Sequence, residues 1–410
     1  MNILMLISEL GYGGAETAFV NLARELARDH RVEIAVFKEQ YQRGNYQQSD
    51  LPAGLIVHRL DPAGETKRAR RWIGRIRKLR ALKRDIKADA TISFLTGPNA
   101  LNVLAGGSGR AIVSVRGSRR YDFNSAPLWR WVNRVLLDPI VFGRADAVVS
   151  VSSGLTREVS NGQDGPNSKF RTISGYVDSA AILASATAPI EPELEFLGRQ
   201  PVLVAAGRLS REKGFGHLLR IFARVRHEVD GAKLLLLGDG PDREPLLAYC
   251  AEQGLRTATG PAGAADADVI FLGFRSEPNR YFRFGRAFVF PSLSEGFPNI
   301  LVEALGAAVP VIVADVPWGS SDVLGVERDA DHRPYPRAVP LRTDFGWLMP
   351  RIDDEAFAGA WAKVMTSHLT GQDSAPADIE QFHRRVREFS CANAAARWNA
   401  LLVELAGARE

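Results

Sequence analysis

Short apolar runs alternate with longer amphipathic stretches along this chain, and no other feature restricts its fold as strongly. Runs of this kind indicate buried β-strands, and the stretches between them have helical spacing. In the first half the runs span residues 3–7, 32–37, 55–60, 90–94, 111–115, 147–151 and 170–173, with helical patterns at 16–28 and 128–142. In the second half they span 202–206, 233–237, 269–272, 287–290 and 310–314, with helical patterns at 216–229 and 299–308. This order predicts two open α/β units, each with a parallel sheet.

The length of 410 residues exceeds the usual size of a single hydrophobic core. Small residues and prolines interrupt the strand rhythm between 176 and 200, so we predict one domain over 1–180 and a second over 198–375. The last helical pattern, 379–408, is predicted to pack back on the first domain. The proline-rich stretch 323–344 is predicted to be an irregular loop inserted late in the second domain.

Composition excludes several classes of protein. With 46% hydrophobic and 24% charged residues, the chain is neither disordered nor fibrous. Its two cysteines, Cys250 and Cys391, lie far apart and form no CxxC, which argues against a disulfide framework and a structural zinc site and fits a reducing cytoplasm. The start, MNILMLIS, reads as a strand rather than a signal peptide, and no apolar run reaches the roughly 18 residues of a membrane span.

One segment carries a concentrated basic charge. Between Lys67 and Lys87 there are eleven Lys or Arg and one acid, whereas the rest of the chain is net acidic although the whole carries +5. Apolar residues recur there every three or four positions, which predicts an amphipathic helix. Packing on the sheet with a solvated basic face explains part of this pattern. An anionic membrane surface or a lipid-diphosphate acceptor explains the rest better than nucleic acid, because no recognition module accompanies the charge. We expect a cytoplasmic protein, peripheral at the inner face of the membrane.

A glycine-rich turn follows the first predicted strand. It contains Gly11, Gly13, Gly14 and Glu16 and leads into a helical pattern. Such a turn leaves backbone N–H groups and a helix start open to an anion, although glycine is also used in tight turns for steric reasons alone. The GxGxxG dinucleotide fingerprint is not met, because Glu16 holds the position of its third glycine.

A second group of candidates opens the other half of the chain. The strand at 202–206 runs into a loop with Gly207, Arg208 and Lys213, two cations placed to neutralise a diphosphate. The turn at Gly238, within GDGP, follows another strand and should line the same crevice. A solvated loop is the alternative interpretation.

The third and most specific motif is PSLSEGFPNILVEA. Glu295 and Glu303 are eight residues apart, the second one two turns into a helix, so that the two carboxylates lie about 10 Å apart and can accept hydrogen bonds from hydroxyls of one ligand. The turn of Gly296, Phe297 and Pro298 should expose the amides at the helix start to a negative group, namely those of Asn299, Ile300 and Leu301.

Through GGAE at 13–16, GRLSREKG at 207–214, GDGP at 238–241 and the motif around Glu295 and Glu303, the chain resembles the family-4 glycosyltransferases over nearly its whole length. The resemblance implies the GT-B fold, two Rossmann-like domains facing each other across a cleft. It implies transfer of a sugar from a nucleoside diphosphate sugar, with UDP ahead of GDP, to a glycan or lipid-linked hydroxyl. It also implies retention at the anomeric carbon and a role in bacterial surface polysaccharide or glycolipid synthesis.

The resemblance also implies roles for individual residues. Arg208 and Lys213 bind the donor diphosphate, Glu295 contacts the transferred sugar, and Glu303 holds the ribose. The turn at 297–301 adds backbone amides, while the N-terminal glycines approach the phosphate and acceptor. We therefore expect catalytic roles for Glu295, Arg208 and Lys213, and a donor site made of Gly13, Gly14, Arg208, Lys213, Gly238, Phe274, Gly296, Phe297, Pro298, Asn299, Ile300, Leu301 and Glu303.

Gly14, Glu16 and Arg116 are expected near the acceptor and the sugar. Many relatives have a histidine at the end of the strand at 111–115, where this chain has Arg116, which cannot act as a general base. Residues 318–322 replace a Gly-Pro-x-Glu turn of many relatives. These departures concern the identity of the donor sugar more than the reaction.

We expect neither a metal ion nor another cofactor. Asp266 and Asp268 match a DxD motif but precede a strand, at the wrong end for a ligand, and 329–331 falls in the insertion. Two other functions stay open: another GT-B enzyme such as a nucleotide-sugar epimerase, and a non-enzymatic protein that binds membrane or nucleic acid through the basic helix.

Overall fold

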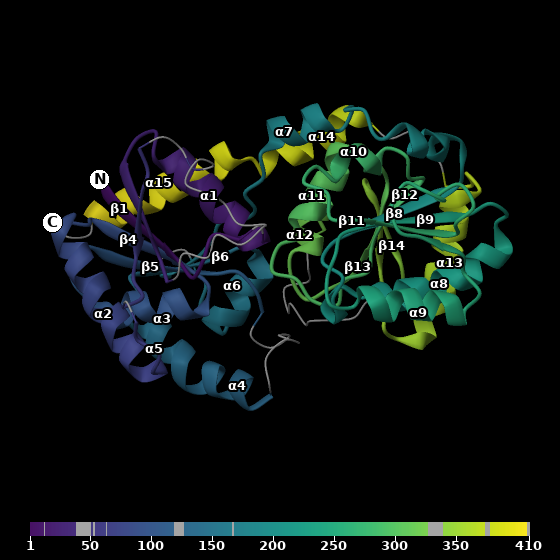
Figure 1. The fold of residues 1–410 in the computed structure, drawn as a ribbon. Helices are drawn as coiled ribbons and strands as arrows, with labels where there is room; N and C mark the ends of the chain where they lie inside the picture. Colours follow the sequence, from purple (N-terminus) through teal and green to yellow (C-terminus); the bar gives the residue numbers. More distant parts are fainter. Residues whose placement is uncertain are drawn as a thin grey trace. The chain divides into compact units, whose positions relative to one another are not determined.

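The structure is a computed structural model that describes residues 1–11, 13–37, 51, 54–62, 64–118, 127–165, 168–326, 339–373 and 378–407. The chain forms two compact units, one of Met1–Val177 with Phe389–Glu410 and one of Asp178–Glu388 (Figure 1). Each unit has its own sheet and its own core, as the alternation of strand and helix patterns predicts.

The N-terminal unit contains a parallel sheet in the order β3-β2-β1-β4-β5-β6-β7. Its strands match the predicted apolar runs: β1 (Asn2–Ile7), β2 (Arg31–Val36), β3 (Ile56–Arg59), β4 (Ala90–Phe94), β5 (Arg110–Val115), β6 (Ala147–Ser150) and β7 (Phe170–Thr172). The order reverses between β1 and β4, so this unit has a Rossmann-like topology.

Helices cover both faces of this sheet. They are α1 (Gly14–Leu26), α2 (Arg68–Asp85), α3 (Thr96–Ala105), α4 (Pro127–Val132), the π-helix η2 (Asn133–Leu137), α5 (Asp138–Arg144), α6 (Ser153–Ser160) and α15 (Cys391–Gly407). In β1, Ile3 and Met5 pack with α1 and α15, whereas Leu4 and Leu6 pack with α2 and α3. This division follows from the alternation of side chains along a strand.

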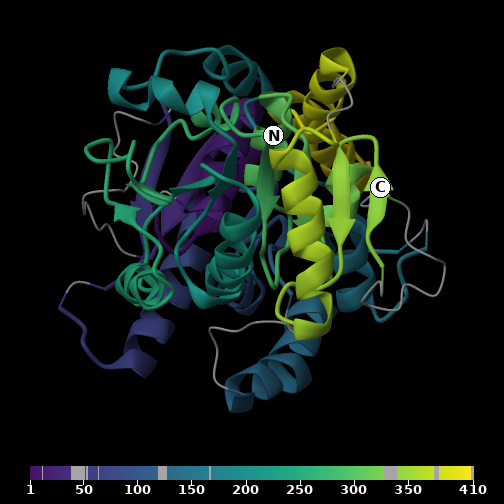
Figure 2. The same cartoon turned by 90° about the vertical axis from the view of Figure 1, so that its right-hand side faces the viewer.

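The C-terminal unit contains a sheet in the order β10-β11-β9-β8-β12-β13-β15-β14, parallel except for the β15–β14 edge (Figure 2). Its strands are β8 (Val202–Ala206), β9 (Lys233–Leu237), β10 (Thr257–Ala258), β11 (Val269–Gly273), β12 (Ala287–Phe290), β13 (Val311–Ala314), β14 (Leu341–Thr343) and β15 (Gly346–Met349). The short strands β10, β14 and β15 have no counterpart among the predicted runs.

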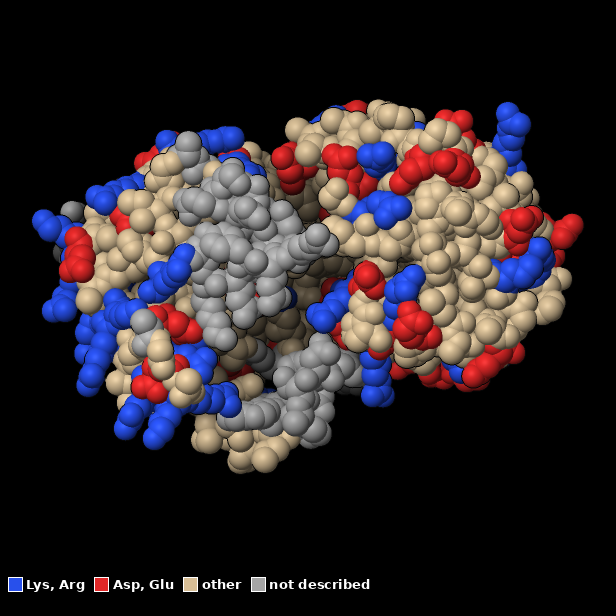
Figure 3. All heavy atoms as spheres, viewed as in Figure 1, with Lys and Arg blue, Asp and Glu red and all other residues tan. Residues whose placement is uncertain are grey.

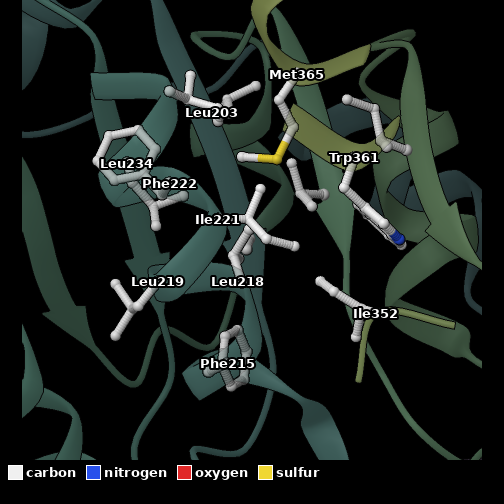
Figure 4. Close-up of a cluster of buried hydrophobic side chains, with 14 of the residues drawn as sticks. Leu203, Phe215, Leu218, Leu219, Ile221, Phe222, Leu234, Ile352, Trp361 and Met365 are labelled. Carbon is white, nitrogen blue, oxygen red and sulfur yellow. The ribbon is translucent and has the colours of Figure 1, made fainter. Parts of the chain in front are cut away.

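The core of the C-terminal unit lies between its sheet and two long helices. The helices of this unit are α7 (Ser179–Ser185), η3 (Pro192–Arg199), η4 (Arg211–Lys213), α8 (Phe215–Glu228), α9 (Arg243–Glu252), α10 (Asn279–Phe282), α11 (Asn299–Gly306), α12 (Ser320–Leu324), η5 (Glu355–Phe357), α13 (Ala358–Leu369) and α14 (Ile379–Glu388). Helix α8 buries Leu218 and Phe222 beside Leu203 of the sheet and Trp361 and Met365 of α13 (Figure 4). This packing holds the start of α8, and the loop before it, against the end of β8.

The limits of the two units differ from the predicted ones. Residues 178–180, predicted in the first domain, and the unassigned stretch 181–197 belong to the C-terminal unit, as does α14. The predicted helix 379–408 is two helices, of which α15 lies in the N-terminal unit. The reason is local packing: the amide of Asn279 donates to Ile182 O at 2.7 Å, and Arg385 of α14 donates to Val323 O at 2.9 Å. Of the predicted insertion 323–344, residues 327–338 lie outside the described part of the chain.

Candidate functional site

Four loops meet at the carboxyl ends of the strands in the C-terminal sheet, after β8, β9, β12 and β13. Strand β8 lies between β9 and β12, where the order of the sheet reverses. In open parallel sheets the crevice at this reversal is the place where ligands bind. The loops that carry Arg208, Lys213, Gly238 and Glu295 all start from this edge.

Glycines let these loops approach each other backbone to backbone. A Cβ on Gly238, whose φ is +133°, would lie 1.9 Å from the carbonyl oxygen of Gly207. A Cβ on Gly214 would lie 2.1 Å from the carbonyl oxygen of Pro291. Glycine is required at both positions because any side chain would displace the neighbouring loop. The motif glycines therefore place the loops that carry the candidate side chains.

Lys213 and Glu295 form an ion pair across the reversal point. Lys213 Nζ donates to Glu295 Oε1 at 2.5 Å, and Ser292 Oγ donates to the same oxygen at 2.7 Å. The other carboxylate oxygen, Oε2, accepts no hydrogen bond within the described residues. The structure thus joins a predicted phosphate-binding cation to a predicted sugar-binding carboxylate, and it leaves one oxygen of that carboxylate available.

Two further predicted residues lie exposed on the same sheet edge. Arg208 follows Gly207 and is exposed, and its guanidinium forms no hydrogen bond or ion pair with the described residues. Phe274 follows β11, and 62% of its surface is exposed. A free guanidinium and an open aromatic face are suited to a phosphate and to a planar ring, respectively.

The start of α11 differs in part from the prediction. Of the three amides expected to be open, Asn299 N donates to Phe297 O at 3.1 Å and Leu301 N donates to Pro298 O at 3.0 Å. Within the described residues, this leaves the Ile300 amide without an acceptor. The preceding turn is held in place by Gly319, where a Cβ would lie 2.8 Å from Gly296 O. One backbone donor, rather than three, is therefore available at this helix start.

Glu303 lies in an environment unlike that of Glu295. Its side chain is half-buried on α11 and has no hydrogen-bond or ion-pair partner among the described residues. Burial raises the pKa of Glu303 to about 7. A carboxyl that is partly removed from water and has no partner is unfavourable when charged, so a ligand hydroxyl that donates a hydrogen bond to it would lower the free-energy cost of its ionisation.

In the N-terminal unit, the turn after β1 shows two different uses of glycine. A Cβ on Gly13 would lie 2.2 Å from Oε2 of Glu16, whose side chain turns back over the start of α1. Burial raises the pKa of Glu16, and Arg116 opposes this effect. Gly14, by contrast, is exposed, and a Cβ there would meet no atom within 4 Å. A side chain at 13 would thus displace the Glu16 carboxylate, whereas a side chain at 14 would displace nothing.

Arg116 lies at the end of β5, held between two aromatic rings. Its guanidinium carbon is 4.8 Å from the ring centroid of Phe94 and 5.0 Å from that of Tyr176. Tyr176 Oη in turn accepts a 2.5 Å hydrogen bond from Trp398 Nε1 of α15. The Nη1 atom of Arg116 is buried and has no hydrogen-bond partner among the described residues. The side chain is thus fixed in place and retains an unused donor beside Glu16.

Two sequence families match this chain, one in each half. Residues 12–181 match Glycosyltransferase Family 4, and residues 200–367 match Glycosyl transferases group 1. The chain belongs to the family-4 glycosyltransferases. The boundary between the two matches coincides with the region where the structure changes from one unit to the other.

Relatives and solved structures agree with this assignment. An uncharacterised glycosyltransferase of Methanocaldococcus jannaschii is 34% identical over 166 residues, 38% of each chain. The N-acetylgalactosamine-N,N'-diacetylbacillosaminyl-diphospho-undecaprenol 4-alpha-N-acetylgalactosaminyltransferase of Campylobacter jejuni is 26% identical over 60% of this chain and 63% of its own. The matched stretches thus span less than two thirds of these relatives. The crystal structure of Anabaena HepE with UDP and glucose has a TM-score of 0.73 at 16% identity, covers 98% of this chain and 100% of its own, and establishes the GT-B fold.

The DxD at 266–268 of this glycosyltransferase has a structural role. Asp268 accepts hydrogen bonds from Arg226 at 2.8 Å and from Arg256 at 2.9 Å, and these contacts hold its pKa well below the usual range despite burial. Within the described residues there is no group of three or more His, Cys, Asp or Glu that could bind a metal ion. The second DxD, 329–331, lies outside those residues.

The basic helix of this glycosyltransferase, α2, has both packed and exposed cations. Arg75 is buried, forms an ion pair with Asp61 and lies 4.1 Å from the ring centroid of Phe37. Lys83 is buried and donates to Asn102 Oδ1 at 2.8 Å, and burial lowers its pKa to about 8. Most of the other cations of α2 and of its two ends are exposed: Lys67, Arg68, Arg70, Arg77, Lys78, Arg80, Arg84 and Lys87. None of the described helices has the length and apolar character needed to cross a bilayer.

Sequence reasoning missed several residues that position the predicted ones. Ser292 supports Glu295, and Phe94, Tyr176 and Trp398 hold Arg116. The serine, three residues before Glu295, is the only one of these with a local sequence signal. The aromatic residues come from distant parts of the chain and are brought together by the sheet order and by α15.

Proposed function

We propose that this glycosyltransferase moves a sugar from a nucleoside diphosphate sugar to a hydroxyl of a glycan or lipid-linked acceptor, with retention at the anomeric carbon. UDP is the preferred nucleotide and GDP the alternative. The contact between Lys213 and Glu295 carries this proposal. It joins a cation suited to a diphosphate with a carboxylate suited to sugar hydroxyls, at the point of the sheet where ligands bind.

The diphosphate would be held by Arg208, Lys213 and the amide of Ile300. Arg208 presents a planar fork of donors, and Lys213 adds a compact charge. The Ile300 N–H adds a backbone donor at the start of α11, where the helix dipole favours an anion. These groups would also stabilise the negative charge that develops on the leaving diphosphate.

The two carboxylates would take different parts of the donor. Glu295 is oriented by Lys213 and Ser292, and its Oε2 is open to hydroxyls of the transferred sugar. Glu303 lacks a partner and would accept from the ribose hydroxyls. In the N-terminal unit, the open space over Gly14 and the fixed guanidinium of Arg116 would serve the phosphate, acceptor or sugar.

In the reaction, the bond between the anomeric carbon and the diphosphate oxygen breaks. A bond to the acceptor oxygen forms on the same face of the sugar, and the acceptor proton passes to the departing diphosphate. Arg208 and Lys213 supply the positive charge that a divalent cation supplies in metal-dependent glycosyltransferases, so we propose that no metal ion takes part.

The acceptor is proposed to be a lipid-linked glycan in the synthesis of bacterial surface polysaccharide or glycolipid. The Campylobacter jejuni relative has a diphospho-undecaprenol-linked acceptor in its name. The exposed cations of α2 would contact anionic headgroups at the inner face of the membrane. Arg77 and Arg84 are better probes of this contact than Arg75, which is buried and paired with Asp61.

Protection against thermal unfolding tests the donor. The full chain is heated with UDP, GDP or ADP and with their sugars, in buffer with and without a chelator. A ligand at 100 times its Kd should stabilise the protein by about 2.7 kcal/mol. If no nucleotide raises the melting temperature, the proposal is wrong. If the chelator abolishes transfer, the metal-free mechanism is wrong.

Substitution of the two glutamates tests the division of their roles. Glu303→Ala should abolish most of the nucleotide protection. Glu295→Ala should keep it and lower turnover by roughly 10²-fold, because the sugar is no longer oriented. Glu252→Gln, an exposed carboxyl on α9, is the control and should change neither quantity. Equal loss of nucleotide binding in both alanine variants would contradict this assignment.

A further inference from the structure

A row of large apolar side chains faces solvent along the helical segment of α4, η2 and α5. Leu128, Trp131, Val135, Leu136 and Ile140 are each between 46% and 73% exposed. Apart from the adjacent pair Val135 and Leu136, they follow one another at three- and four-residue steps, which places them along one side of the segment. We call these five residues the apolar stripe. Exposed large apolar residues scattered singly are ordinary, but a row on one helical segment marks an interaction surface.

The opposite side of the segment anchors it to the N-terminal unit. Asp138, Val141 and Phe142 are buried, and the ring of Phe142 meets that of Phe170 edge to face, with centroids 6.2 Å apart. Helix α5 also contacts α3. The π-helix η2, by contrast, has no buried residue. The segment is therefore fixed at its C-terminal end, and its apolar side is directed away from the core.

Positive charge accompanies the apolar stripe. Arg134 and Arg144 are exposed on the same segment. Helix α3, which contacts both α5 and α2, carries Leu104 as a further exposed apolar residue. Beyond it lie the six exposed cations of α2, with Lys67 and Lys87 at its two ends, and Figure 3 shows Lys and Arg side chains gathered over this region of the N-terminal unit. One face of the unit thus combines apolar side chains with cations.

We propose that the apolar stripe inserts into the headgroup region of an anionic lipid bilayer while the exposed cations of α2 contact lipid phosphates. Amphipathic helices with an apolar side and flanking Arg or Lys bind in this way. A second copy of the chain is a poorer occupant, because a self-complementary contact would bring the cationic α2 helices toward each other. The inference rests on the proposed function in one respect: a lipid-linked acceptor would be reached at the membrane surface.

The two contributions to docking have different salt dependence. Cation–phosphate attraction is screened as the Debye length shrinks from about 10 Å near 0.1 M salt, whereas apolar insertion is not. The full chain should therefore bind vesicles with about 30% phosphatidylglycerol at low salt, keep a measurable part of that binding near 0.5 M salt, and bind pure phosphatidylcholine weakly.

Sedimentation with these vesicles separates the two contributions. The stripe variant Trp131→Gln/Leu136→Gln should lose the salt-resistant binding, a drop of about tenfold or more. A charge variant, Arg77→Gln/Arg84→Gln, should lose mainly the low-salt part. The control Ile379→Gln/Val403→Gln removes equally exposed apolar residues outside the stripe and should bind as the parent does.

Trp131 also reports directly on insertion. The fluorescence of Trp131 is obtained as the difference between the parent and Trp131→Phe. Lipids with brominated acyl chains should quench this fluorescence, because the indole of Trp131 would lie among the lipids. The proposal is overturned if the stripe variant sediments like the control. It is equally overturned if that variant changes only the oligomeric state in gel filtration.

These outcomes are independent of the donor chemistry. The stripe variant should retain nucleotide protection in thermal unfolding, since the stripe lies in the N-terminal unit and the proposed nucleotide-binding residues lie largely in the C-terminal one. If the stripe variant loses vesicle binding and keeps full nucleotide protection, the result supports docking of the apolar stripe on the membrane. Absence of nucleotide protection in the parent would refute the proposed function whatever the vesicles show.

Discussion

At the scale of single residues, glycine at two adjacent positions has two different explanations. A Cβ on Gly13 would have to displace the carboxylate of Glu16, whereas a Cβ on Gly14 would meet no atom within 4 Å. A glycine that packing does not require, at the start of a helix, lowers helix stability relative to alanine by up to about 1 kcal/mol. This is what the proposed function predicts for Gly14, where the proposed ligand would approach α1.

Gly14→Ala should make the protein slightly more stable and less active. Alanine favours the helix by about 0.5–1 kcal/mol, but its methyl group would enter the space proposed for the phosphate and acceptor. Turnover and the melting temperature are measured together. Gly359→Ala is the matched control, since a Cβ there also meets no atom within 4 Å, and it should raise stability without loss of turnover. Unchanged turnover in Gly14→Ala would assign this glycine to the turn alone.

The raised pKa of Glu303 predicts a pH dependence of stability. In the unfolded chain this group has its ordinary pKa of 4.5, and in the folded protein its pKa is about 7. Between these values the folded state binds more protons, so the free energy of unfolding falls as pH rises from about 4.5 to 7. Glu303→Gln removes this effect and should stabilise the ligand-free protein by on the order of 1–3 kcal/mol above pH 7 and by almost nothing near pH 4.

Denaturant unfolding at several pH values measures this difference. Glu252→Gln should show no such trend, because that carboxyl is exposed. A stability gain for Glu303→Gln that is the same at low and high pH would mean that burial does not penalise the charged carboxyl.

At the scale of elements, the site depends on loops that touch through their backbones. The loop after β8 and the turn after β9 are joined by hydrogen bonds from Gly207 N to Leu237 O at 2.9 Å and from Leu209 N to Asp239 O at 3.0 Å. These contacts leave no room for a side chain on Gly238. The spacing of the glycines in the motifs therefore reflects the distance between neighbouring strands as much as the ligand.

Gly238→Ala should destabilise the C-terminal unit by about 3 kcal/mol or more, because the new methyl group would clash with Gly207 O and the backbone would be strained at positive φ. Gly254→Ala separates the two causes: its φ is +68°, but a Cβ there meets nothing within 4 Å, so only strain of about 1 kcal/mol is expected. If Gly238→Ala and Gly254→Ala lost the same stability in thermal unfolding, the contact between the loops at Gly238 and Gly207 would not be tight.

At the scale of the whole molecule, the end of the chain completes the unit formed by its beginning. Helix α15 packs Trp398, Leu401 and Leu402 into the core beside β1 and α1. Trp398 also donates to Tyr176, the residue that stacks on Arg116. The last helix of the chain therefore supports a candidate site residue more than two hundred positions earlier in the sequence.

Trp398→Ala should destabilise the N-terminal unit by about 3–5 kcal/mol and leave nucleotide protection of the C-terminal unit in place. Trp398→Phe keeps most of the buried ring but loses the hydrogen bond to Tyr176, for a cost of about 1 kcal/mol. Val403→Ala, exposed on the same helix, should be close to neutral. In calorimetry that resolves the two units, only the unfolding transition of the N-terminal unit should shift. A shift of both transitions would contradict the expectation that the two units unfold independently.

The sequence by itself determined most of the strands, their order along the chain and the motif residues, because apolar runs and glycine turns are local signals; it missed the short strands β10, β14 and β15. It did not determine which residues meet. Lys213 and Glu295 are 82 positions apart and pair because β8 and β12 are neighbours in the sheet. The sheet order likewise decided that Asp268 is held by arginines. Packing decided that α14 and α15 belong to different units and that the apolar side of 128–140 faces outward. These outcomes depend on long-range packing, to which no local pattern in the sequence corresponds.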